Sequence, residues 1–183
     1  RQMCIRDRYD TLAAGDIPEL TNEELIGIVS GLHTTDARKK LVETALSLVG
    51  KVSYFWGGKS PAGWNDEWGK PKKVTSSGSV TSGTLRPYGL DCSGFTDWVY
   101  KTALGQSIGT GSASQWSKST EISASELLPG DLGFKAKPSD PGTNHVLMYV
   151  GLTSDGKRQW VHCSSSAGGV VLNTPSYVKY YRR

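Results

Sequence analysis

Asp91-Cys92-Ser93-Gly94-Phe95 marks the point where a Gly- and Ser-rich loop turns into an apolar helix, and we expect the fold to be built around it. Gly105 is placed to end this helix. Its apolar stripe at helical spacing comprises Phe95, Trp98, Val99 and Ala103. Because the first turn of a helix favours thiolate over thiol, the placement of Cys92 predicts a nucleophile. The alternative for a single cysteine here is a small buried apolar residue.

The composition limits the classes of protein that the chain can belong to. It has 183 residues, with 21 Lys and Arg against 17 Asp and Glu, a net charge of +4. The basic residues are scattered, which favours weak attraction to an anionic surface such as a bacterial wall over nucleic-acid binding. No apolar run reaches 18 residues, so we expect no membrane span. We expect a monomer. We also expect no structural disulfide, because the three cysteines cannot all pair and no two of them form a CxxC pair.

Two helix-start signals divide the N-terminal part of the chain. Thr21 and Glu24 have capping-box spacing before an apolar segment that runs to Leu32. Thr35-Asp36 opens a second helical pattern that ends near Gly50. We therefore expect an N-terminal extension or linker over residues 1–34 and a catalytic domain over residues 35–183.

The first eight residues, Arg1-Gln2-Met3-Cys4-Ile5-Arg6-Asp7-Arg8, lack the pattern of a signal peptide. They resemble translated sequencing-adapter sequence. We therefore assign no role to Cys4, and we expect a native N-terminus with its export signal to be missing from this chain.

A segment of 32 residues, 59–90, separates a Tyr54-Phe55-Trp56-Gly57-Gly58 turn from Cys92. It is rich in Gly, Ser, Pro and Lys, and so long a loop inside a compact domain is usually functional. We interpret it as an ordered insertion beside the Cys92 site, with Trp56, Trp64 and Trp68 on the rim of a substrate cleft. The alternative is a surface excursion without a role.

The C-terminal half predicts an antiparallel sheet. Leu128-Pro129-Gly130-Asp131-Leu132 is typical of a turn that leads into a strand, and a short helix precedes it at residues 112–116. Three further strands are expected at His145–Val150, Gln159–Ser164 and Gly169–Leu172. Helices followed by such a sheet indicate an α+β domain.

Three histidines are available as a base for the Cys92 thiol. His33 precedes the predicted domain and is expected to be a solvated residue at a helix end. His145 opens a strand, and His162 lies within the next one, where the alternation of side chains places Cys163 on the opposite face, in the core. Together with Cys92, the two later histidines also match a Cys-His-His zinc site. We favour the nucleophile, because these residues are far apart in sequence and lack close ligand pairs.

Five motifs in order make the sequence similar to the NlpC family of bacterial cell-wall cysteine peptidases. They are Tyr54-Phe55-Trp56-Gly57-Gly58, Asp91-Cys92-Ser93-Gly94-Phe95, Pro129-Gly130-Asp131-Leu132, His145-Val146-Leu147-Met148-Tyr149-Val150-Gly151 and Val161-His162-Cys163-Ser164. The resemblance covers roughly residues 37–178. It implies a papain-like α+β fold in which the nucleophile helix packs on a small antiparallel sheet.

The resemblance also implies roles for individual residues. Cys92 is similar to the nucleophile, His145 to the general base and acid, and His162 to the residue that orients His145. Tyr54 matches a tyrosine whose hydroxyl lies near the thiol and binds the oxyanion or substrate; the alternative is an aromatic core residue. Asp91 and Ser93 are expected to contact substrate or else to cap the helix. The backbone N–H of Cys92 is the expected oxyanion donor.

The implied activity is hydrolysis of peptidoglycan stem peptides by a secreted or wall-associated enzyme, typically at the bond between γ-linked D-glutamate and a diamino acid. Acyl transfer through Cys92 requires no metal and no cofactor. One alternative is an N-acetylmuramoyl-L-alanine amidase of the Cys/His amidohydrolase type. Another is a non-catalytic cell-wall-binding module that uses Trp64 and Trp68 for stacking.

Overall fold

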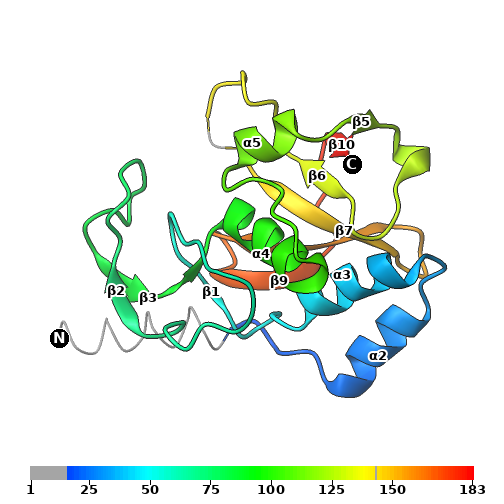
Figure 1. Cartoon of the computed structure of the whole chain (residues 1–183), viewed down its shortest axis with the longest axis horizontal. Helices are drawn as coiled ribbons and strands as arrows, with labels where there is room; N and C mark the ends of the chain where they lie inside the picture. Colours follow the sequence, from blue (N-terminus) through cyan, green and yellow to red (C-terminus); the bar gives the residue numbers. More distant parts are fainter. Residues whose placement is uncertain (1–15, 143) are drawn as a thin grey trace.

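A curled sheet with helices packed on one face organises the chain (Figure 1). The computed structural model describes residues 16–142 and 144–183. Helices α3 and α4 lie against the sheet, α2 packs beside α3, and α5 contacts α4 beside β6. The helices are α2 (Asn22–Ser30), α3 (Asp36–Leu46), α4 (Cys92–Leu104), α5 (Ser112–Ser117) and the 3-10 turn η1 (Ala124–Glu126).

The helix ends follow the capping residues that the sequence predicts. Thr21 forms a complete capping box with Glu24, and Thr35 caps α3. Asp91 caps α4, whose predicted stripe is buried, and Gly105 ends the helix in the left-handed conformation. Helix α3 ends at Leu46 rather than near Gly50. His33 is exposed, as expected.

The eight-stranded sheet has the order β4-β1-β9-β8-β7-β6-β10-β5. Its strands are β1 (Ser53–Tyr54), β4 (Gly89–Leu90), β5 (Glu121–Ile122), β6 (Leu132–Phe134), β7 (Val146–Leu152), β8 (Arg158–Ser164), β9 (Gly169–Asn173) and β10 (Tyr180–Arg182). The predicted strands are confirmed with shifts of one or two residues at their ends. The sheet is larger than expected, and it is not wholly antiparallel, because β1 and β4 pair in parallel.

Both faces of the central strands are covered. Met148, Val161 and Cys163 face α3 and α4 in the main core, whereas Leu147, Tyr149 and Trp160 pack under the C-terminal segment. The predicted alternation is therefore confirmed, and Cys163 is a core residue on the face opposite to that of Trp160 and His162. The N-terminal segment also belongs to this core: residues including Leu25 and Val29 of α2 pack on it.

The insertion over residues 59–90 is ordered and contains a two-stranded hairpin, β2 (Pro71–Lys73) and β3 (Leu85–Pro87). The hairpin lies beside β1 and β4, away from α2 and α3 (Figure 1). Several hydrogen bonds tie the insertion to the domain. Among them, the Trp56 indole donates to the Ser77 carbonyl at 2.8 Å, and the Trp98 indole donates to the Gly63 carbonyl at 2.8 Å.

Asp131 is a fully buried carboxylate at the turn that leads into β6. Its two oxygens accept hydrogen bonds from Arg38 (2.9 Å), from Arg183 (2.7 and 3.0 Å) and from the backbone N–H of Leu128 (2.8 Å). A buried carboxylate is stable only when its lone pairs are satisfied in this way. Asp131 therefore joins α3, the turn and the last residue of the chain.

We expect Asp131→Asn to lower the free energy of unfolding by about 3 kcal/mol, because the partly buried Arg38 guanidinium and the exposed Arg183 guanidinium both lose the buried carboxylate that they bind. Urea unfolding at neutral pH measures this change. Asp155→Asn is the matched control: its ion pair with Lys157 is exposed, and we expect a change within about 0.5 kcal/mol. Equal effects of the two substitutions would contradict the role given to Asp131.

Candidate active site

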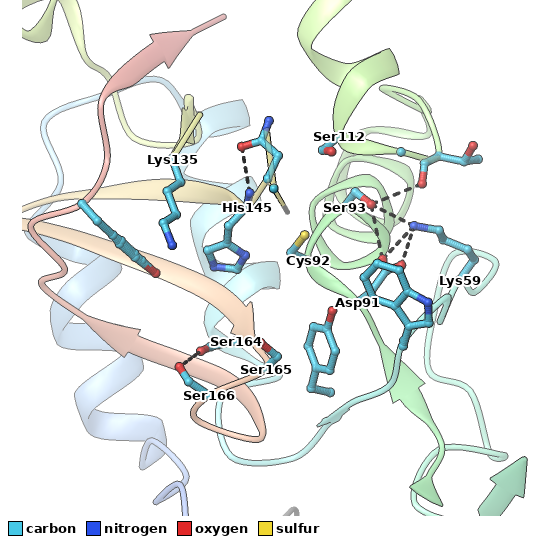
Figure 2. A pocket seen from close by; sticks show the side chains of 17 residues that line it. Lys59, Asp91, Cys92, Ser93, Ser112, Lys135, His145, Ser164, Ser165 and Ser166 are labelled. Atoms are coloured by element: carbon cyan, nitrogen blue, oxygen red, sulfur yellow. Dashed lines mark hydrogen bonds and ion pairs between the residues drawn. The ribbon is translucent and has the colours of Figure 1, made fainter. Parts of the chain in front are cut away.

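A cleft of about 750 Å³ lies where the N-terminus of α4 meets the start of β7. Cys92 and His145 both line it, and Figure 2 shows the Cys92 sulfur beside the His145 ring. Lys135 lies next to His145, whereas Lys59 and Ser93 lie on the other side of Cys92 (Figure 2). The structure thus brings together residues from three distant parts of the chain: Lys59, the first turn of α4, and the segment from Lys135 to His145.

Close backbone packing fixes the position of Cys92. The Gly58 carbonyl accepts a hydrogen bond from the Asp91 N–H at 3.1 Å, just before the helix begins. A Cβ at Gly94 would overlap with the Gly58 carbonyl oxygen, so only glycine at position 94 lets the Tyr54–Gly58 turn approach the first turn of α4. Because Cys92 is the first residue of the helix, its N–H has no acceptor within α4.

The thiol of Cys92 is less acidic than the sequence suggested. Burial raises its pKa, and the nearby Asp91 carboxylate acts in the same direction. Backbone hydrogen bonds from Val146 and Ser93 and the charge of Lys59 lower the pKa but do not outweigh burial. The helix N-terminus is therefore not sufficient to lower the pKa of Cys92, and the thiol needs a base to become a nucleophile.

A row of hydrogen bonds holds the imidazole of His145. Its Nε2 lies 2.8 Å from Nδ1 of His162, and Nε2 of His162 lies 2.7 Å from Oδ1 of Asn173. His162 is 1% exposed, so its ring is fixed between these two partners. Sequence reasoning missed Asn173, although the register of a β8–β9 hairpin would place it opposite Trp160, on the face that carries His162.

This row determines which ring nitrogens carry protons. The Asn173 oxygen only accepts, so His162 donates from Nε2 and accepts at Nδ1. His145 then donates from Nε2, and its Nδ1 keeps a free lone pair. Burial, with smaller contributions from His162 and Lys135, lowers the pKa of His145 to about 3, so the ring is neutral. A neutral His145 with an unprotonated Nδ1 can take the proton of a thiol.

Tyr54 is half-buried and lines the same cleft. Burial, followed by the charges of Cys92 and Asp91, raises the pKa of its phenol. The hydroxyl therefore stays protonated as a hydrogen-bond donor beside the thiol, which suits developing negative charge.

Asp91 has its lone pairs occupied within the protein. Its Oδ1 accepts from the Gly94 N–H at 2.6 Å, and its two oxygens accept from the Lys59 ammonium at 2.7 and 2.9 Å. Ser93 is buried and accepts from the same ammonium at 2.8 Å. Of the two roles that the sequence left open, helix capping is confirmed for Asp91. Lys59, the first residue of the insertion, was not anticipated.

The three tryptophans expected at the cleft rim are separated. Trp56 lines the cleft. Trp68 is instead buried, donates to the Ser60 hydroxyl at 3.1 Å, and packs edge to face on Trp98. Trp64 is 58% exposed and lines a different surface pocket with Trp98. Trp64 and Trp68 lie near Trp98 of α4, because this part of the insertion packs on that helix.

In residues 16–142 and 144–183, no group of three or more His, Cys, Asp or Glu side chains is arranged to hold a metal ion. Both ring nitrogens of His162 already have hydrogen-bond partners. Over the same described ranges, none of the helices combines the length and apolarity needed to cross a membrane.

The two histidines predict a loss of stability in mild acid. Both pKa values lie below 6.5 in the folded protein, so the unfolded chain binds protons more readily as the pH falls through 6.5. Stability is full above that pH and declines below it, by up to about 1.4 kcal/mol per pH unit for each histidine. Urea unfolding between pH 7.5 and pH 4.5 measures the decline. A His145→Gln/His162→Gln protein should show a shallower decline; the same slope would exclude these residues as its cause.

The sequence model of one protein family, NlpC/P60, matches residues 50–183. The "Probable endopeptidase p60" of Listeria grayi is 44% identical over 71 residues, which is 39% of this chain and 13% of that protein. The "Gamma-D-glutamyl-L-lysine dipeptidyl-peptidase" of Bacillus cereus is 36% identical over 98 residues, which is 51% of this chain and 28% of that protein. The chain spans less than a third of the length of these curated relatives.

A solved structure supports the same likeness. The crystal structure of the NlpC/p60 domain of the peptidoglycan hydrolase SagA superposes with a TM-score of 0.56 at 27% identity, covering 80% of this chain and 97% of that one. The predicted papain-like α+β fold is confirmed.

Proposed function

Because this chain belongs to the NlpC/P60 family, we propose that it is a cysteine-type peptidoglycan endopeptidase with Cys92 as nucleophile and His145 as general base and acid. The observation that carries the proposal is the row Asn173–His162–His145, which leaves Nδ1 of His145 free at the cleft that Cys92 lines. A thiol, a base and a group that orients the base are the parts that acyl transfer needs.

The reaction proceeds by two acyl transfers. The Cys92 sulfur attacks the peptide carbonyl carbon while its proton passes to Nδ1 of His145. The resulting imidazolium is stabilised by the lone pair of His162. The N–H of Cys92 and the hydroxyl of Tyr54 donate to the oxyanion.

The intermediate collapses when the C–N bond breaks, and His145 returns the proton to the departing amine. Water then attacks the thioester: one of its protons goes to His145 and from there to the leaving Cys92 sulfur. The same side chains thus serve both half-reactions, and the thiol is regenerated.

The proposed substrate is the peptidoglycan stem peptide, cut between γ-linked D-glutamate and the diamino acid. The name of one relative, the Bacillus cereus γ-D-glutamyl-L-lysine dipeptidyl-peptidase, supports this bond. The name of another, the Escherichia coli murein DD-endopeptidase MepS/murein LD-carboxypeptidase, supports peptidoglycan as the substrate. From this substrate we propose that the enzyme acts outside the cell or at its wall. We further propose that residues 35–183 form the catalytic unit, with α2 packed on it as an extension.

Mass spectrometry of muropeptides incubated with the purified chain tests the function. The expected products are a fragment that ends in D-glutamate and a fragment that begins with the diamino acid. Release of intact stems from muramic acid would indicate an amidase instead. Binding of muropeptides without any new mass would favour a non-catalytic wall-binding module.

A further inference from the structure

The positively charged side chain of Lys135 lines the cleft but has no role in the proposed acyl transfer. This residue directly follows β6, is exposed, and lines the cleft with His145. Asp91 is the one acidic side chain among the described lining residues, and its carboxylate is paired with Lys59. Within residues 16–142 and 144–183, Lys135 forms no ion pair; its ammonium lies 5.5 Å from the centre of the Tyr177 ring. The cleft therefore presents an unneutralised positive charge.

The position of Lys135 relative to His145 indicates on which side of the scissile bond its positive charge lies. Its backbone N–H donates to the His145 carbonyl at 3.0 Å, and its ammonium is close enough to contribute to the lowered pKa of His145. Figure 2 shows Lys135 and His145 on the same side of Cys92, opposite to Lys59. His145 must reach the departing amine to protonate it. Lys135 thus lies on the side of the leaving group.

A second unsatisfied donor occupies the same side. Asn144 lines the cleft, and its side-chain oxygen accepts from the N–H groups of Ala136 and His145 at 3.1 and 2.8 Å. Its amide nitrogen is buried and has no partner among the described residues. An ammonium and an amide N–H that both lack acceptors among residues 16–142 and 144–183 suit an anion with several lone pairs, such as a carboxylate.

We propose that Lys135 binds the side-chain carboxylate of the residue that supplies the leaving amine, so that the enzyme selects stem peptides with diaminopimelate over those with lysine. This inference rests on the proposed function. The two diamino acids differ at the end of the side chain: diaminopimelate carries a carboxylate beside its amine there, whereas lysine carries the ammonium alone. A cation at this position attracts the first and repels the second.

The test compares two tetrapeptides, L-Ala-γ-D-Glu-X-D-Ala, in which X is diaminopimelate or lysine. Their α-carboxyl groups at X are both blocked, so the side-chain carboxylate is the difference that matters. We expect the wild type to show at least about a tenfold higher kcat/KM for diaminopimelate. Lys135→Gln should bring the ratio close to 1, and Lys135→Glu should reverse it.

Lys137→Gln is the matched control. Lys137 is exposed two residues along the same segment, with its ammonium 5.4 Å from the Tyr180 ring, but it does not line the cleft. Its substitution should leave the ratio unchanged. An unaltered ratio in Lys135→Gln would overturn the inference. So would an equal loss on both peptides, because Lys135 would then bind a carboxylate that both share.

A binding measurement separates this inference from the proposed function. Calorimetry compares the affinity of Cys92→Ala and Cys92→Ala/Lys135→Gln proteins for the diaminopimelate tetrapeptide. About tenfold weaker binding by the double variant supports the role of Lys135, even if the wild type cleaves neither peptide and the proposed activity fails. Equal affinities overturn the role of Lys135 regardless of turnover.

Discussion

Replacing Cys92 by alanine is expected to lower kcat on stem peptides by about 10⁵-fold, because no other group can form the thioester. Binding should change by no more than about threefold, since the side chain is small and the cleft walls come from other elements. Turnover is measured by product mass over long incubations, and binding by calorimetry with the same peptide.

Cys163→Ala is the matched control. This thiol is fully buried on the opposite side of β8 from His162 and donates to the Leu90 carbonyl at 3.1 Å. We expect it to lose about 1–2 kcal/mol of stability while keeping kcat within a few-fold. If Cys92→Ala retained a tenth of the wild-type rate, Cys92 would not be the nucleophile.

Replacing His162 by alanine is expected to lower kcat by about 10³-fold with little change in KM. The imidazole of His145 would then lose the acceptor that fixes its tautomer and stabilises its protonated form. His162→Gln should lose only about tenfold, because a glutamine oxygen can accept from His145 while its nitrogen donates to Asn173. Steady-state kinetics on the same peptide measures both variants.

The difference between the two His162 variants is the informative result. A purely structural role would lower the folded fraction of both variants and leave kcat per folded molecule unchanged. Circular dichroism and urea unfolding give the folded fraction for each. Equal losses in kcat for alanine and glutamine would contradict the proposed hydrogen-bonded row.

Local signals in the sequence predicted most of the framework. The caps Thr21, Thr35 and Asp91 and the left-handed Gly105 act within one helical turn, so their effect is readable without the fold. The alternation of side-chain direction along β8 correctly separated Cys163 from the His162 face, since the period of a strand is two residues.

What the sequence did not predict depends on contacts between distant segments. The β2–β3 hairpin is three residues long on each side, and all three residues of β2 are exposed, so it has no alternation to detect. The pKa of Cys92 could not be judged from its place on the helix, because the burial that raises it comes from the rest of the fold. Trp68 likewise packs on Trp98, a residue of α4 that lies 30 positions away in sequence.

The protonated state of the Cys92 thiol bears on how the chain would react with electrophiles. Simple alkylating reagents need a thiolate, so they should modify Cys92 slowly and leave the enclosed Cys163 untouched. A peptide electrophile seated in the cleft can instead recruit His145 to remove the proton. In a Cys4→Ser background, such a reagent would label one sulfur per molecule, that of Cys92. It would react only in molecules whose His145 imidazole is correctly positioned. The amount of label would therefore measure the concentration of active enzyme rather than that of total protein.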